Sequence, residues 1–375
     1  MARTRQAIPE MGILTRTCLR LGDQIFQPLQ ILLLMSIWAI TAYFNPRKFQ
    51  ARLRNYRTFR CQLCIPLLTV EWSQDGDFQL GANEADQMVR VRGGDLMWQK
   101  ERLLAIAATH LPQECDGILL IDADILLPEG WVDQLPLALE RAPVVQPFRE
   151  VHHLPPLPQE VLQTPELLLQ QRHLFYLSRQ SFADHALHGA LPTAHPNVKL
   201  DSSSGQQQEV ERLAARPSFG HAWALRREWL ERVGLYEHSV AGSGDLAFAM
   251  AIAGLAGEYC ASYPLNQAQQ CHYLRWAAAA ALPSGEGPAR LGRLDGVALH
   301  LFHGHLNRRS YRSRLKVLSA SGFDPALDLS AEAGQPFRWS HSRDRTEALP
   351  RFFETYFHNR AEDEGLTPLL ERHRA

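Results

Sequence analysis

The segment GILLIDADI, residues 117–125, restricts the fold of this chain more than any other feature. Its continuous apolar run is typical of a strand buried on both faces, as in a parallel sheet covered by helices. Burial of an unpaired carboxylate is strongly unfavourable, so Asp122 and Asp124 need a cation, hydrogen-bond donors or solvent. Side chains alternate along a strand, so both carboxylates lie on the same side and can converge on one ligand.

Apolar runs alternate with helical patterns along much of the remaining chain. Strands are predicted at residues 37–44, 66–72, 87–92 and 144–148. One helix is predicted to begin with Asp95 as its N-cap, and another with Asp245 as its N-cap. This alternation predicts an α/β fold with a mainly parallel central sheet. Ligands of such sheets bind beyond the carboxyl ends of the strands, where Asp122 and Asp124 lie.

The length of 375 residues and a hydrophobic content of 45% allow a large core in one big domain or two modest ones. We interpret residues 1–34 as an N-terminal leader or extension, 35–330 as the main domain, and 331–375 as a C-terminal helical tail packed on the body. Residues 151–219, with prolines and a polar tract, are interpreted as an excursion that carries a mobile loop over the site. A further hypothesis takes Met35 as the native start.

The apolar stretch at residues 26–44 is long enough to suggest a membrane span. Polar residues interrupt it, and its second half ends in an Asn-Pro turn, so we favour a buried strand there. Membrane association is therefore not favoured. We expect a cytoplasmic protein, with a peripheral contact to the inner membrane as the alternative.

Charge and motifs exclude several classes of function. The formal net charge of -1 provides no global field for nucleic acid or anionic membrane, so any phosphate site must be local. Neither a GxGxxG nor a GxxxxGK[ST] motif occurs, which leaves dinucleotide and P-loop chemistry without support. Cys61 and Cys64 lack a second ligand pair for zinc, and we interpret them as buried thiols in a reducing compartment.

An Asp-x-Asp pair at a strand end suits a hard divalent cation that bridges to substrate phosphates. The alternative is that Asp122 and Asp124 are turn and cap residues. His300 and His303, in the segment LHLFHGH, either add an imidazole ligand or are buried histidines satisfied by the backbone.

The segment GSGD, residues 242–245, places Asp245 at a helix N-terminus after a turn that lets a substrate approach the backbone. A plain N-cap would explain Asp245 but not the two glycines. A general base suits such a rigid position. One or two of the arginines among Arg308, Arg309, Arg312 and Arg314 are expected to meet a diphosphate, and the rest to form a solvated face; Lys100 has the same two readings. The rings of Trp98 and Trp223 either pack on the apolar face of a sugar or belong to the hydrophobic core.

Several motifs in order resemble glycosyltransferases of the GT-A fold over about residues 36–360. They are YFN, WQKERLL, IDAD, QPF, GHAWALRREWLERVGLYE, GSGD and HLFHGHLNRRSYRSR followed by GFDP. The chain is most similar to bacterial and phage members, and more loosely to polypeptide N-acetylgalactosaminyl and β-galactosyl transferases. The resemblance implies a Rossmann-like GT-A fold with helices on both faces of the sheet, and Mn²⁺ or Mg²⁺ as cofactor. It also implies sugar transfer from a nucleoside-diphosphate sugar, with a UDP-sugar favoured, to a hydroxyl of a glycan or glycoconjugate, without nucleic acid.

The resemblance also implies roles for individual residues. Metal ligands would be Asp122, Asp124, His303 and, as second choice, His300; Asp122 would alternatively reach the ribose. Donor contacts would come from Tyr43, Asn45, Lys100 and Arg308. Asp245 would be the base of an inverting reaction, although Gly244 stands where many inverting relatives have Glu, which leaves the base and the stereochemistry open.

Three alternative functions are compatible with parts of this sequence pattern. A phosphatase of the haloacid dehalogenase type also carries an Asp-x-Asp at a strand end, but usually near the chain start and followed by Thr. A nucleotidyltransferase would use the same fold and metal and release pyrophosphate. An inactive scaffold that binds glycans would bind the donor without turnover.

Overall fold

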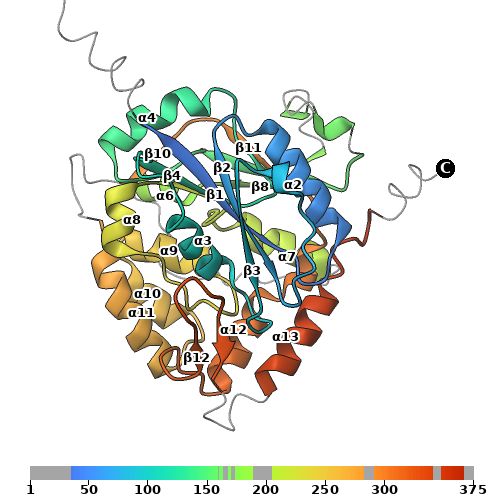
Figure 1. Ribbon diagram of the computed structural model, residues 1–375, viewed down its shortest axis with the longest axis vertical. Helices are drawn as coiled ribbons and strands as arrows, with labels where there is room; N and C mark the ends of the chain where they lie inside the picture. Colours follow the sequence, from blue (N-terminus) through green and yellow to red (C-terminus); the bar gives the residue numbers. More distant parts are fainter. Residues whose placement is uncertain are drawn as a thin grey trace, which may run out of the picture.

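The computed structural model describes residues 35–158, 160–163, 168–169, 174–188, 205–282, 291–340 and 348–366. A seven-stranded sheet in the order β10-β6-β9-β4-β1-β2-β3 lies at its centre (Figure 1). Its strands are β1 (Ile37–Phe44), β2 (Leu67–Ser73), β3 (Gln87–Arg92), β4 (Gly117–Ile121), β6 (Val144–Gln146), β9 (Ala222–Arg226) and β10 (Leu291–Arg293). Only β9 runs antiparallel to its neighbours, β4 and β6. The prediction of a mainly parallel α/β sheet is confirmed.

Helices cover both faces of this sheet, as expected. One face packs against α2 (Gln50–Gln62) and α4 (Trp131–Arg141). The other packs against α3 (Lys100–Ala108), α8 (Arg227–Val233) and α9 (Gly244–Ile252). All residues of β4 are therefore buried. Each of its buried Ile and Leu side chains contributes about 1.5–3 kcal/mol relative to exposure, so the strand that carries the Asp-x-Asp motif is rigidly held.

A second sheet in the order β5-β11-β7-β8 brings distant segments to the end of β4. Its strands are β5 (Ile125–Leu126), β7 (Glu150–His153), β8 (Leu177–Gln180) and β11 (Val297–His300). His300 pairs in register with Ile125, and the Leu301 amide donates to the Asp124 carbonyl at 2.9 Å. The late histidines are thereby fixed beside the Asp-x-Asp motif.

The excursion contributes the outer part of this sheet and two helices, α6 (Phe182–Leu187) and α7 (Gly205–Ala214). Residues 189–204, which include the start of its polar tract, lie outside the described residues. The 3-10 segment η4 (Leu306–Arg309) packs against α7. Two further short 3-10 segments are η1 (Ala82–Glu84) and η2 (Val161–Gln163). The mobile loop predicted over the site stays a prediction, because residues 189–204 are outside the described part of the chain.

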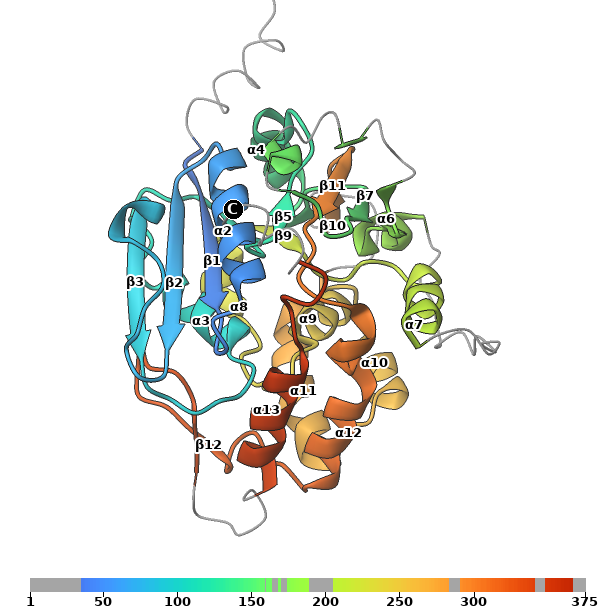
Figure 2. The same ribbon diagram turned by 90° about the vertical axis from the view of Figure 1, so that its right-hand side faces the viewer.

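The C-terminal half adds a group of helices, which Figure 2 shows together at one end of the molecule. They are α10 (Ala256–Ser262), α11 (Gln267–Ala280), α12 (Tyr311–Ala320) and α13 (Ala348–Asn359). A short hairpin of β12 (Leu329–Ser330) and β13 (Arg338–Trp339) precedes α13. Leu349, Phe353 and Phe357 of α13 are buried in the core that also contains β1 and β2. The boundaries proposed at residues 34 and 330 stay predictions, and residues 1–34 lie outside the described residues.

The structure differs from the predictions at Asp95, Cys61 and Cys64, and agrees with the strand predicted at residues 37–44. Asp95 is not an N-cap, because α3 begins at Lys100, and Asp95 Oδ2 instead accepts from the Trp339 amide at 2.7 Å. This bond ties the C-terminal segment to the sheet, a long-range contact that local pattern cannot indicate. Cys61 and Cys64 are exposed, so their interpretation as buried thiols was wrong. Residues 37–44 do form a strand, and within the described residues no helix has the length and apolarity to cross a membrane.

Candidate active site

A cavity of about 240 Å³ lies at the carboxyl ends of β1 and β4. Asp122 and Asp124 reach it from the end of β4, and His300 and His303 from the end of β11. Lys100 enters from the first turn of α3, and Asp245 from the first turn of α9. With Tyr43 from the end of β1, the cavity thus brings together seven of the predicted site residues from five separate segments.

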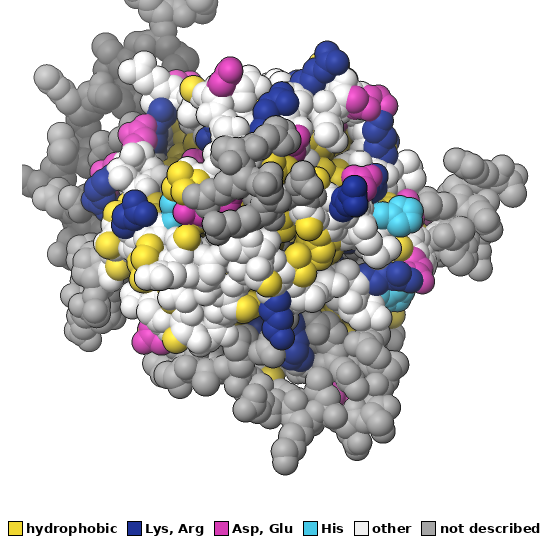
Figure 3. Space-filling model, turned by 90° about the horizontal axis from the view of Figure 1, so that it is seen from below, with side chains coloured by type: hydrophobic (Ala, Val, Ile, Leu, Met, Phe, Trp, Pro, Cys, Tyr) yellow, Lys and Arg dark blue, Asp and Glu magenta, His cyan; other side chains and the backbone are white. Residues whose placement is uncertain are grey.

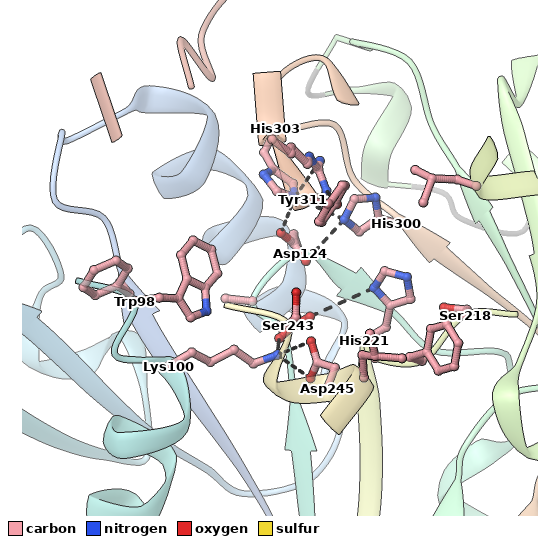
Figure 4. A pocket seen from close by; sticks show the side chains of 18 of the residues that line it. Trp98, Lys100, Asp124, Ser218, His221, Ser243, Asp245, His300, His303 and Tyr311 are labelled. Carbon is pink, nitrogen blue, oxygen red and sulfur yellow. Dashed lines mark hydrogen bonds and ion pairs between the residues drawn. The ribbon is translucent and has the colours of Figure 1, made fainter. Parts of the chain in front are cut away.

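Asp124, His300 and His303 point toward one another in Figure 4. Asp124 Oδ2 lies 3.1 Å from His303 Nε2, and Asp124 Oδ1 lies 3.8 Å from His300 Nε2. One ligand atom from each of the three lies within 4.8 Å of the others. Asp124 Oδ1 is buried without a hydrogen-bond partner among the described residues. One carboxylate and two imidazoles, with an oxygen left unpartnered, fit a divalent cation.

The electrostatics agree with this fit. Burial, followed by the charge of Asp122, raises the pKa of Asp124 to about 7. Burial is also the main reason why the pKa values of His300 and His303 lie well below their ordinary range. Both imidazoles are therefore neutral, which is the form that ligates metals. Arg309 Nη2 also lies 3.0 Å from His303 Nε2, so a bound cation would replace this contact.

Three charged side chains, Glu362, Arg52 and Arg360, lie together on one side of His303. Glu362 is 1% exposed, and its Oε2 lies 3.7 Å from His303 Nδ1. Arg52 donates to both Glu362 oxygens, at 2.5 and 2.9 Å, and Arg360 forms an ion pair with it. Although burial is the largest influence on Glu362 and raises its pKa, Arg360 and Arg52 bring that pKa well below its usual value. The anion lies beyond hydrogen-bond distance of His303 Nδ1, so it contributes negative charge behind the ring of this residue.

Asp122 belongs to a different cluster from Asp124. Lys100 Nζ lies 2.5 Å from Asp122 Oδ1, and 2.9 and 3.1 Å from the two oxygens of Asp245. Burial is the largest influence on Lys100 and lowers its pKa, but Asp122 and Asp245 together raise it well above the usual value. Among the described residues Asp122 does not join the three-residue metal cluster. The expectation that both carboxylates share one cation is thus not supported by this geometry.

The two glycines of GSGD make room for side chains of the protein itself. A Cβ at Gly244 would lie 2.0 Å from Glu101 Oε1, and a Cβ at Gly242 would lie 2.9 Å from the Arg314 guanidinium carbon. Ser243, not Asp245, is the N-cap, and it has a left-handed backbone with φ of 71°. Asp245 is the second residue of α9. The glycines are therefore explained by packing, without a substrate at the backbone.

Glu101 is the buried acid that this packing serves. It is 8% exposed, and neither of its carboxyl oxygens has a hydrogen-bond partner among the described residues. Burial raises the pKa of Glu101 to about 8, against the opposing charge of Lys100. At neutral pH the group is therefore mainly protonated, directly behind Asp245.

His221 is a cavity residue that the sequence reasoning did not single out, although it lies in the quoted segment GHAW. Its φ of 79° is unusual for a residue with a side chain and costs about 1–3 kcal/mol. The His221 carbonyl accepts from the Asp122 amide at 2.8 Å, which anchors this conformation. Burial, then the nearby Arg179, lowers the pKa of His221 to about 3, so its ring is neutral. Strain at a cavity-lining histidine marks it as a functional candidate.

The remaining predicted residues differ in their relation to the cavity. Tyr43 lines it, and burial raises the pKa of its hydroxyl to about 12. Asn45 does not line it; its amide donates to the Tyr43 hydroxyl at 3.1 Å and thus positions that residue. Arg308 lies outside the cavity and pairs with Glu364 at 2.6 Å.

The neighbouring Arg309 lines the cavity in place of Arg308, as do Arg314 and Arg360. Trp98 lines it and stacks on Phe357, whereas Trp223 is 3% exposed and belongs to the core. The sequence predicts that one or two of the four arginines at positions 308, 309, 312 and 314 contact a diphosphate. Only the three-dimensional structure shows that Arg309 and Arg314 are the ones that line the cavity.

Comparisons with known proteins give only distant similarity to solved structures. No protein-family model matches the chain, and no curated protein matches it. The chain is similar to glucosyl-3-phosphoglycerate synthase from Mycobacterium tuberculosis, solved with Mn²⁺, UDP-glucose and phosphoglyceric acid, at 13% identity and a TM-score of 0.36. That similarity covers 88% of this chain and 96% of the other. A second similar structure is the catalytic domain of Drosophila β1,4-galactosyltransferase 7 with xylobiose, at 14% identity and a TM-score of 0.26, over 59% of this chain and 63% of the other. Identities and TM-scores this low carry no argument about chemistry, which rests on the site itself.

Proposed function

We propose that this chain is a metal-dependent glycosyltransferase, which moves a sugar from a nucleoside-diphosphate sugar to an acceptor hydroxyl. The observation that carries the proposal is the arrangement of two clusters in one cavity. Asp124, His300 and His303 place three ligand atoms within 4.8 Å of one another, which suits a metal ion, and the carboxylate of Asp245 faces the same cavity with its side chain 39% exposed. A metal ion at the first cluster would stabilise the charge of the departing diphosphate, and the carboxylate of Asp245 would take the proton of the acceptor hydroxyl.

The cation would be Mn²⁺ or Mg²⁺, and two imidazoles favour the softer Mn²⁺. When bound, it would supply positive charge that stabilises the departing diphosphate. Tyr43, at the end of β1, is proposed to contact the base or ribose, and Arg309 the diphosphate, because both line the cavity. A UDP-sugar is the favoured donor, and a glycan or glycoconjugate the favoured acceptor.

Asp245 is proposed as the base that takes the proton of the acceptor hydroxyl. Lys100 donates to both of its oxygens and thereby holds the carboxylate in place. Direct attack by that hydroxyl on the anomeric carbon would invert the configuration, so we propose an inverting reaction. We also propose a cytoplasmic location, since all described cysteines are free thiols.

The test is a thermal-shift panel of UDP, GDP, CDP and TDP and their common sugars, each with Mn²⁺ and with EDTA. A ligand that binds only the folded state raises the apparent melting temperature. We expect a metal-dependent shift with one nucleotide and the corresponding sugar nucleotide, and then release of the nucleoside diphosphate when acceptors are added. Release of pyrophosphate would indicate a nucleotidyltransferase instead. Absence of any shift would contradict the proposal.

A further inference from the structure

The charge inside the cavity differs from the charge on the surface. Figure 3 shows Lys and Arg, Asp and Glu, and hydrophobic side chains interspersed on the face seen from below, in keeping with the formal net charge of -1. The cavity is lined by eight Lys and Arg side chains but only three Asp side chains. Lys100 pairs with Asp122 and Asp245, and Arg52 and Arg360 pair with Glu362, so these three cations and three carboxylates balance as a group. The other cavity arginines include Arg179, Arg216, Arg309 and Arg314.

Four of these arginines, Arg179, Arg216, Arg309 and Arg314, have no carboxylate within 4.0 Å among the described residues. Their hydrogen-bond partners are neutral: Arg314 Nη1 donates to the Tyr356 hydroxyl at 2.7 Å, and Arg309 Nη1 to the Tyr311 hydroxyl at 3.2 Å. Arg314 is 3% exposed and Arg309 7% exposed, and the Nε of each has no hydrogen-bond partner. Buried cations without counter-charge are unfavourable, so this arrangement indicates an anionic ligand.

Arg179 and Arg216 belong to one wall of the cavity. Arg179 Nε donates to the Arg216 carbonyl at 3.1 Å, and its Nη2 donates to the carbonyl of Pro217. Arg216 donates to the hydroxyl of Tyr263. Burial lowers the pKa of Arg179 to about 10, which leaves it charged at neutral pH. Both guanidiniums therefore retain their charge and are held by neutral oxygens.

This wall leads directly to Asp245. Residues 218–221 continue from it into the cavity, and a Cβ at Gly220 would lie 2.6 Å from the Asp245 carboxyl carbon. Arg314 Nη2 lies 3.5 Å from the hydroxyl of Ser243, which precedes Asp245 by two residues. Arg309 is the exception, since it contacts His303 on the metal side. Arg314 and the segment that follows Arg216 thus lie next to the segment of Asp245, whereas Arg309 lies next to the metal-ligand candidates.

A donor cannot use all of this charge. A nucleoside-diphosphate sugar carries about two negative charges, and one divalent cation balances them. Arg309, next to the metal ligands, adds further charge for the departing diphosphate. Arg179, Arg216 and Arg314 remain, and they line the same cavity as Asp245. Guanidinium groups from separate segments of one cavity suit a phosphate, which offers three oxygens.

We propose that the acceptor carries a phosphate monoester, which Arg179, Arg216 and Arg314 bind while a hydroxyl of the same molecule faces Asp245. This inference rests on the proposed function and defines its acceptor class. The acceptor oxygen forms the new bond to the anomeric carbon as the bond from that carbon to the diphosphate breaks. The nucleoside diphosphate leaves with the electron pair, the hydroxyl proton passes to Asp245, and the phosphate monoester is unchanged.

The test compares sn-glycerol 3-phosphate with glycerol as probes, by calorimetric titration with and without saturating UDP and Mn²⁺. We expect the phosphorylated probe to bind in both conditions and glycerol not to bind. Arg216→Gln and Arg179→Gln should each weaken binding of the phosphorylated probe about tenfold, since a charge-assisted hydrogen bond is lost. Arg275→Gln, an exposed arginine of α11 outside the cavity, is the matched control and should bind like the wild type. If Arg179→Gln does not fold, Arg179→Lys and Arg216→Gln provide the comparison.

Binding of UDP with Mn²⁺ is measured in the same variants and separates the two proposals. Retained UDP binding with weakened glycerol phosphate binding supports the acceptor assignment. Weakened UDP binding with unchanged glycerol phosphate binding would overturn it, as would equal binding of glycerol and its phosphate. Wild type that binds the phosphate probe but no nucleotide would contradict the proposed function and leave an anion site. Lysophosphatidic acid is a second probe: tighter binding than glycerol phosphate would identify a lipid source of the phosphate, and weaker binding a soluble one.

Discussion

Asp122 and Asp124 follow the same strand two residues apart, yet the first contacts a cation and the second contacts two neutral imidazoles. Asp122 and Asp245 both contact Lys100, so each of these two carboxylates has a cationic partner within the protein. Asp124 faces two neutral imidazoles, and one of its oxygens is unpartnered. We call the first region, that of Asp122 and Asp245, complete because each of its carboxylates contacts a lysine, and the second incomplete because Asp124 contacts no Lys or Arg among the described residues. A metal is therefore expected on one side of the motif only.

The largest expected effect comes from removing the carboxylate of the incomplete region. Asp124→Asn removes the anionic metal ligand, so we expect Mn²⁺-dependent donor binding to be lost and transfer to fall about a thousandfold or more. Calorimetry with Mn²⁺ and UDP, together with initial rates, measures both. Asp295→Asn is the matched control, because that side chain is 77% exposed and lies outside the cavity. Unchanged metal affinity in Asp124→Asn would refute the division into two regions.

The complete region should respond in a different way. Asp245→Asn keeps the shape of the side chain but removes the proposed base, so transfer should fall about a hundredfold to ten-thousandfold while donor binding is retained. Single-turnover rates at saturating donor separate the two effects. A variant that loses donor binding along with transfer would place Asp245 in the donor site, and retained transfer would shift the base assignment to another group such as His221.

The extent to which these features follow from the sequence depends on the range of the contacts. The strands and the mainly parallel sheet follow from apolar runs, and Asp124, His300 and His303 from residue types that suit a metal. The partners of Lys100 come from β4 and α9, far apart in the chain, and no local pattern indicates them. In the same way, Arg308 and Arg309 are adjacent and chemically identical, and only the packing of η4 turns one of them inward.

Gly244 gives a test of how tightly the complete region is packed. Gly244→Ala places a Cβ against the Glu101 carboxyl, so we expect the free energy of unfolding to fall by about 1–3 kcal/mol. Gly257→Ala, in α10, meets no atom within 4 Å and should be neutral or stabilise by up to about 1 kcal/mol. Urea denaturation of both variants measures the contrast. Equal stability of the two would show that Glu101 moves away without cost, and that Gly244 does not fix its position.

The smallest expected effect is the pH dependence of metal binding, which depends on the incomplete region alone. Without a cation the pKa of Asp124 is raised to about 7, whereas His300 and His303 stay neutral because their pKa values are well below the usual range. Asp124 must lose its proton to bind a metal. Mn²⁺ affinity should therefore rise about tenfold per pH unit below pH 7 and level off above it. Calorimetry from about pH 5.5 to about pH 8 measures this dependence. Affinity that continues to rise well above pH 7 would assign the titration to Glu101, whose pKa is raised to about 8, and affinity independent of pH would show that Asp124 is already ionised.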